Sequence, residues 1–197
     1  MPVYECRLVL ELPARSPAPW AAGTSRMLVW VPRAQGPAEQ QRAFAQVLLR
    51  LSQEHDRMWG YPVRILVDAR RLEARLRSRG LVDLAMCLDE WSWLFECRTP
   101  DVLAYLLNER YFERVAFFWT ADADLARSLA AQTAKEEITG NDRYDSALLC
   151  LARPCGGIAL YSITHDNLEL LGTPEFVLRR CAAALLPWVE GATTDLH

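Results

Sequence analysis

The first residues of the chain alternate between apolar and charged positions. In VYECRLVLEL, residues 3–12, the apolar side chains Tyr4, Cys6 and Leu8 alternate with Glu5 and Arg7. A period of two predicts a β-strand with one buried face. A second apolar run, RMLVWVP, follows a proline-rich loop. We therefore expect these two strands to pair as a hairpin across a long connection.

The pattern then changes to the helical period. Over residues 36–59 the positions of Phe44, Val47, Leu48 and Leu51 follow the i, i+3, i+4, i+7 spacing of an amphipathic helix. Pro37 fits the first turn, where its missing N–H leaves no hydrogen bond unmade. We expect Gly60 to end this helix and YPVRILVDA to form a strand.

A short arginine-rich helix is predicted from residue 69 to Gly80. Leu72 and Leu76 lie four residues apart and are expected to face the core. Two interpretations of the charged positions stay open: a solvated helix face, or a patch for phosphate or an acidic partner. Those positions are Arg70, Arg71, Arg75, Arg77 and Arg79.

The stretch WSWLFECRTPD, residues 91–101, fits two periods. As a strand it places Trp91, Trp93 and Phe95 on one face, in the core. As a helix continuing from residue 81 it exposes Trp93 among carboxylates. The tripeptide Thr99-Pro100-Asp101 is a good helix start, and a strand can run directly into it. We therefore favour the strand.

The remaining pattern mixes strands and helices without strict alternation, which predicts one α+β domain over residues 1–197, with a mixed, mostly antiparallel sheet and packed helices. Thr120 or Asp122 is expected to cap the helix at 122–138. A hairpin around residues 154–157 and a final helix at 174–189, kinked near Pro187, complete the prediction. The other predicted elements are a helix at 100–112 and a strand at 114–120.

Composition indicates an ordinary globular protein of 197 residues. No apolar run approaches the roughly 20 residues that span a bilayer, and the first residues lack a secretory layout, so we expect a cytoplasmic protein without membrane contact. Residues 1–98 carry a net charge of +3 and residues 99–197 a net charge of −6. The acidic second half argues against nucleic acid as the main partner.

Candidate chemistry is sparse. The six cysteines have irregular spacing and only three histidines accompany them, so we expect buried reduced thiols, no metal site and no cofactor. Motifs for nucleotide binding, zinc hydrolysis or a nucleophilic serine do not occur in the sequence. One alternative is an enzyme of unrecognised type, with Cys155 as nucleophile and His165 and Asp166 beside it at the end of the strand 157–164.

A polar segment after the helix at 122–138 is the strongest candidate for binding. Interfaces are enriched in tyrosine and arginine, and a negative patch accelerates docking to a basic partner. Loops carry function more often than the elements that they join. The predicted contact residues are Glu136, Glu137, Asp142, Arg143, Tyr144 and Asp145.

This profile resembles that of the small cytoplasmic immunity proteins that accompany bacterial secreted toxins. The resemblance lies in general properties of the sequence: one α+β domain of this size, an acidic segment, seven tryptophans and no recognisable set of catalytic residues. It implies a stoichiometric inhibitor that binds one cognate toxin and carries out no reaction itself. A basic toxin such as a nuclease would suit the acidic segment.

Overall fold

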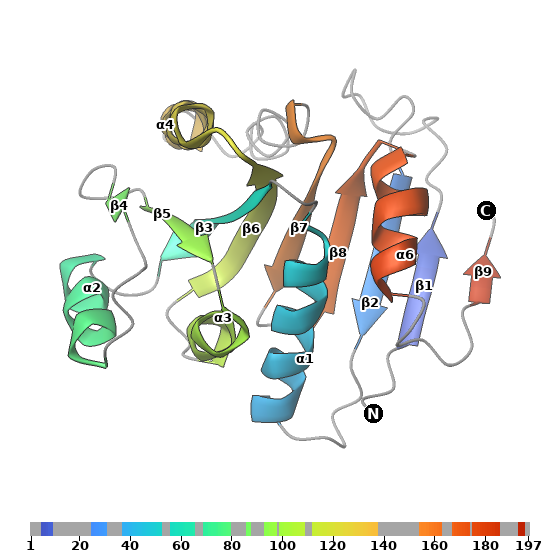
Figure 1. Cartoon of the computed structure of the whole chain (residues 1–197), viewed down its shortest axis with the longest axis horizontal. Helices are drawn as coiled ribbons and strands as arrows, with labels where there is room; N and C mark the ends of the chain where they lie inside the picture. Colours follow the sequence, from blue (N-terminus) through green and yellow to red (C-terminus); the bar gives the residue numbers. More distant parts are fainter. Residues whose placement is uncertain are drawn as a thin grey trace.

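A computed structural model shows a single mixed sheet with helices on both faces (Figure 1). The strand order is β4-β5-β3-β6-β7-β8-β2-β1-β9, and every neighbouring pair is antiparallel except β1 with β9. The predicted α+β class with a mostly antiparallel sheet is confirmed. The structure describes residues 5–9, 25–30, 37–52, 56–65, 69–79, 86–87, 93–97, 99–108, 112–137, 154–162, 167–173, 175–185 and 193–195.

The elements have the following bounds. The strands are β1 (Glu5–Val9), β2 (Ser25–Trp30), β3 (Arg57–Ile65), β4 (Met86–Cys87), β5 (Trp93–Cys97), β6 (Phe112–Thr120), β7 (Gly157–Ser162), β8 (Asn167–Gly172) and β9 (Thr193–Asp195). The helices are α1 (Pro37–Arg50), α2 (Ala69–Ser78), α3 (Pro100–Asn108), α4 (Ala123–Glu137), the π-helix η4 (Glu175–Cys181) and α6 (Ala182–Leu185).

One face of the sheet packs against α1, α3 and η4. Phe44, Val47 and Leu48 of α1 are fully buried, and so is Leu51 directly after the helix, as the helical period predicted. They join side chains of one sheet face, such as Phe117, in a single apolar cluster. Burial of such large side chains stabilises the fold by roughly 1.5–3 kcal/mol each. Figure 1 shows α1, α3 and α6 on the same side of the sheet.

The opposite face packs against α4. Trp59 of β3 and Phe118 of β6 form a second cluster with Ala126 and Ala130 of α4. Successive residues of β6 alternate between the two clusters, as the pleat requires. Asp122 caps α4, because its Oδ1 accepts the N–H groups of Asp124 and Leu125 at 2.9 and 3.1 Å.

Within the WSWLFECRTPD stretch, residues 93–97 form a strand. β5 begins at Trp93, and both Leu94 and Phe95 are buried, so this strand contributes to the cores on both faces. Trp91 lies outside the described residues, and nothing is described of the Trp93 side chain, so only the buried position of Phe95 is confirmed. The next helix starts at Pro100, as predicted, and the Leu103 N–H donates to the Thr99 carbonyl oxygen.

Two boundary predictions were wrong. The first helix ends at Arg50, and Arg57, Met58 and Trp59 belong to β3. Met58 and Trp59 are both buried, on opposite faces, so a strand accommodates them better than an extended helix face would. Gly60 therefore does not end a helix. It lies in β3 opposite Phe95, whose ring occupies the space that a Cβ would need.

The first arm of the predicted hairpin around residues 154–157 lies outside the described residues. The described strand of its second arm, β7, pairs with β6 on one side and with β8 on the other. β8 was not predicted as a strand. The final helix is confirmed to Leu185, but its first seven residues form a π-helix. Pro187 lies outside the described residues.

Candidate functional site

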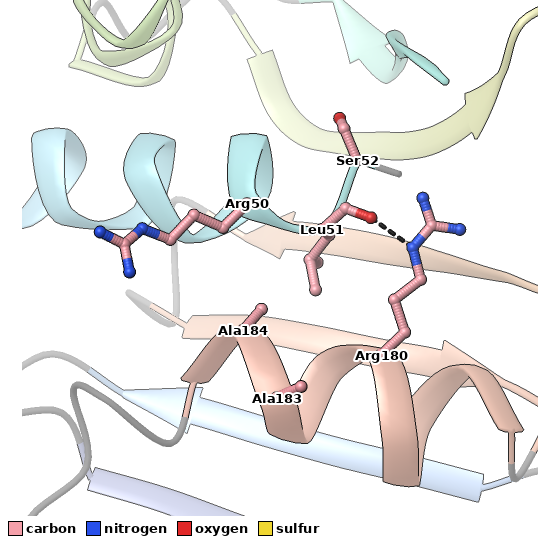
Figure 2. Close-up of a pocket in the computed structure, with 6 residues that line it drawn as sticks. All are labelled: Arg50, Leu51, Ser52, Arg180, Ala183 and Ala184. Carbon is pink, nitrogen blue, oxygen red and sulfur yellow. Dashed lines mark hydrogen bonds between the residues drawn. The ribbon is translucent and has the colours of Figure 1, made fainter. Parts of the chain in front are cut away.

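A shallow, open groove lies between the carboxyl end of α1 and the η4–α6 helix pair (Figure 2). Its volume is about 420 Å³. Figure 2 shows Arg180 pointing toward the end of α1, with Ala183 and Ala184 on the helix that faces it. The lining residues are Arg50, Leu51, Ser52, Arg180, Ala183 and Ala184.

Arg180 is fixed by two hydrogen bonds from its guanidinium group. Its Nε donates to the Leu51 carbonyl oxygen, and one terminal nitrogen donates to Asp56 Oδ2 at 2.7 Å. The two charged side chains are only 15% and 23% exposed, so solvent screens this pair less than a surface pair. The Leu51 carbonyl group lies directly after α1, at the end of the helix where carbonyl groups lack helical partners and favour a nearby cation.

Two aromatic rings support the same guanidinium group. Its carbon lies 5.5 Å from the ring centroid of Trp119 in β6 and 5.7 Å from that of Phe176 in η4. The two rings lie 5.7 Å apart. Cation–π contacts of this kind add roughly 0.5–2 kcal/mol when they are partly desolvated. Arg180 is therefore held in one orientation before any ligand arrives.

The start of η4 is built from close backbone packing. Thr173 caps the helix: its Oγ1 accepts the Phe176 N–H at 3.2 Å, and its own N–H donates to the Gly156 carbonyl oxygen at 2.9 Å. Gly156 has a positive φ of 75°, which favours glycine. The Phe176 ring lies directly on Gly157, where a Cβ would collide with it. π-helices are rare and occur often at functional sites.

Cys155 lies half-buried close to this cluster. Burial is the main cause that raises the pKa of its thiol from 9.0 to about 11, and the charge of Asp56 adds to the effect. A hydrogen bond from the Trp119 backbone and the charge of Arg180 act in the opposite direction. The thiol is therefore protonated at neutral pH, which weighs against Cys155 as a nucleophile. His165 and Asp166 lie outside the described residues, so their pairing with Cys155 stays a prediction.

The predicted binding segment falls at the margin of the described residues. Glu136 and Glu137 lie in the last turn of α4, and nothing is described of their side chains. The remaining predicted contacts lie outside the described residues: Asp142, Arg143, Tyr144 and Asp145.

Sequence reasoning missed Arg180 and Asp56. A signal for Arg180 exists, because Phe176, Val177 and Cys181 are buried and Arg180 follows Phe176 by one helical turn. A charge on such a stripe requires a partner. The partner itself could not be identified, since Asp56 lies 124 residues away in the chain.

The groove provides the chemistry of recognition. Its lining offers guanidinium groups, the Ser52 hydroxyl and small alanine side chains. Among the described residues no group of three or more histidine, cysteine or carboxylate side chains could hold a metal ion. In the same part of the chain, every helix is too short or too polar to cross a bilayer.

Comparisons with known proteins do not assign the chain to a group. No family model matches the sequence, and neither the curated proteins nor the solved structures include a match.

Proposed function

We propose that the protein is an intracellular binding protein, an immunity protein that neutralises one cognate bacterial toxin by stoichiometric contact. The observation that supports this proposal is the fixed Arg180 guanidinium at the edge of a shallow, open groove. Arginine and tryptophan are enriched at binding hot spots. An arginine that is already ordered loses little conformational entropy when a partner docks.

The groove is one part of the proposed interface. Stable complexes bury on the order of 1,600 Å² in total, which exceeds what a groove of this size offers. The acidic segment around Tyr144 is the second proposed contact. A partner side chain enters the groove above Ala183 and Ala184. The carboxylates of residues 136–145 meet basic groups of the partner at a separate contact, because α4, which leads into this segment, packs on the opposite face of the sheet.

The first experiment is a capture. The tagged protein is expressed in its own host, washed at high salt, and its co-purifying chains are identified by mass spectrometry. We expect one stoichiometric protein that is toxic when produced alone and harmless when produced together with this chain. A captured protein without toxicity, or the lack of any stoichiometric partner, would contradict the immunity function.

Groove variants then test the contact surface. Ala183 is exposed and lines the groove, so Ala183→Trp fills the groove without disturbing the core. We expect it to weaken binding of the captured partner at least tenfold by calorimetry. Ala38→Trp is the matched control, because Ala38 is equally an exposed helical alanine but lies in the first turn of α1, at the opposite end of that helix from the groove. Equal affinities of the two variants would exclude the groove.

The acidic segment is tested separately. Joint alanine substitution of Glu136, Asp142, Tyr144 and Asp145 is expected to slow association with the partner, because these groups steer a basic surface. An unchanged association rate would place the second contact elsewhere and leave the groove assignment intact.

A further inference from the structure

Arginine is concentrated in α2 and in the residue that follows it. Residues 69–79 contain five arginines and one glutamate, a net charge of +4, whereas the whole chain has a net charge of −3. Figure 1 shows α2 at one end of the long axis, beyond β4 and β5. Net acidity therefore hides a local basic surface, and local charge decides which anion can dock.

The exposed positions of α2 cover a broad arc of the helix. Arg71, Arg75 and Arg77 are exposed, and so are Ala74 and Ser78 between them. At about 100° per residue, Ala74, Ser78 and Arg75 all lie within about 60° of Arg71, whereas Arg77 lies about 120° away on the side of Ala74. The centre of the arc therefore combines small and arginine side chains, and an arginine marks one flank.

The opposite flank is fixed by α3. Arg79 follows the helix directly, and its guanidinium carbon lies 4.9 Å from the ring centroid of Tyr105. Both are accessible, since Arg79 is exposed and Tyr105 is half-buried. The Ser78 hydroxyl donates to the Arg75 carbonyl oxygen at 2.8 Å. This side chain therefore lies against the backbone of α2 and does not project from the helix surface.

We infer that α2 is a DNA-binding helix that enters the major groove of a duplex. The major groove is about 12 Å wide and admits one helix, and a helix of ten residues is about 15 Å long. A helix in this groove faces phosphates on both sides, which matches arginines on both flanks. The small residues at the centre permit close approach to the base edges, where arginine bonds guanine bidentately.

The dense and regular charge of a duplex favours this ligand over an acidic protein. DNA carries one negative charge per about 1.7 Å of its axis, so the arginines of α2 meet phosphates at any register. The carboxylates of an acidic protein are spaced irregularly, so each would have to lie opposite a particular arginine on the exposed arc of α2. The inference is independent of the proposed function, because it concerns a different surface and the chain alone.

The test is fluorescence anisotropy of a labelled 20-base-pair duplex with the purified full chain. We expect binding at low salt that weakens with a slope of log K against log salt of about −3, as three or four phosphate contacts give. Arg71→Gln/Arg75→Gln/Arg77→Gln/Arg79→Gln is expected to weaken binding at least tenfold. The triple variant that keeps Arg79 preserves the Tyr105 contact and is expected to lose most of the binding as well.

A charge-matched control separates α2 from the total charge. Arg42, Arg57, Arg127 and Arg179 are exposed to 62%, 51%, 46% and 80%, and their ion pairs lie on other elements. Changing all four to glutamine removes the same charge, and we expect it to change DNA affinity less than threefold. Equal loss in both quadruple variants would overturn the inference.

Two other results would also overturn it. One is the lack of binding by the unmodified chain at up to about 100 µM, the weak end of non-specific DNA binding. The other is displacement of the duplex by poly-glutamate or by phosphatidylserine vesicles as effectively as by unlabelled duplex, which would identify α2 as a contact for acidic proteins or for membranes.

Discussion

At the scale of single residues, Arg180 and Cys155 show how one neighbourhood treats a charged and a neutral group differently. The guanidinium group of Arg180 lies among a carbonyl oxygen, a carboxylate and two aromatic rings, all of which attract a cation. The thiol stays protonated because burial and the Asp56 charge both disfavour the thiolate. Asp56 thus forms an ion pair with the guanidinium group and disfavours the thiolate of Cys155.

The raised pKa of Cys155 predicts a pH dependence of stability. In the unfolded chain the thiol ionises near 9.0, and in the folded protein near 11. Between these values the unfolded state binds fewer protons, so the stability contributed by the neutral thiol is complete below about 9 and is lost as pH rises through about 11. Urea denaturation between pH 8 and pH 11 measures this effect. The free energy of unfolding of the unmodified protein is expected to fall more steeply with pH than that of Cys155→Ala. Identical pH dependences of the two proteins would contradict the prediction.

At the scale of elements, β3 and β5 are matched through one glycine. Gly60 pairs with Phe95, and the Phe95 ring fills the space above it. The ring also packs edge to face on Phe117 in β6, with centroids 6.3 Å apart. Three adjacent strands are therefore positioned by a single aromatic side chain.

Gly60→Ala is expected to destabilise the fold by about 1–3 kcal/mol, because the new methyl group overpacks the core against Phe95. In a Phe95→Leu background the same change is expected to cost less, since the smaller side chain can give way. The free energies of unfolding of the unmodified protein, the two single variants and the double variant are measured in urea and form a double-mutant cycle. Additive losses would show that the methyl group meets something other than the ring.

Periodicity in the sequence was sufficient for elements with one dominant pattern. Phe44, Val47 and Leu48 located α1, and the alternation around Cys6 and Leu8 located β1, because a single period dominates each of these segments. The end of α1 was misplaced because β3 is buried on both faces and shows no alternation. β8 was missed because its partners are set by tertiary pairing, which the local pattern of NLELLG does not reveal.

At the scale of the whole molecule, the Arg180 groove is assembled from segments that are far apart in the chain. Arg180 bonds to residues 129 and 124 positions earlier, at the end of α1 and before β3. This is the physical reason why the sequence could not indicate the site: its members share no local spacing. The arginine arc of α2, by contrast, is a local feature, and the sequence already presented it as one of two open interpretations.

Asp56→Asn is expected to reduce stability by about 1.5–3 kcal/mol, the usual cost of losing a hydrogen bond to a charged group. The variant leaves Arg180 partly buried without its carboxylate. Asp101→Asn is the control, because Asp101 and its ion-pair partner Arg42 are 75% and 62% exposed and solvent screens such a pair. The urea denaturation midpoints of the two variants are compared. A larger loss of stability for Asp101→Asn than for Asp56→Asn would contradict a stabilising role of the Arg180–Asp56 ion pair.

The strand order has a consequence for biosynthesis. β2 pairs with β1 on one side and with β8 on the other, and Ser25 lies opposite Gly172. A ribosome releases β2 long before β8, so the open edge of β2 stays unpaired during most of translation. An unpaired strand edge is a template for association with other chains. The nascent protein therefore needs either rapid completion or a chaperone that shields this edge until β8 emerges.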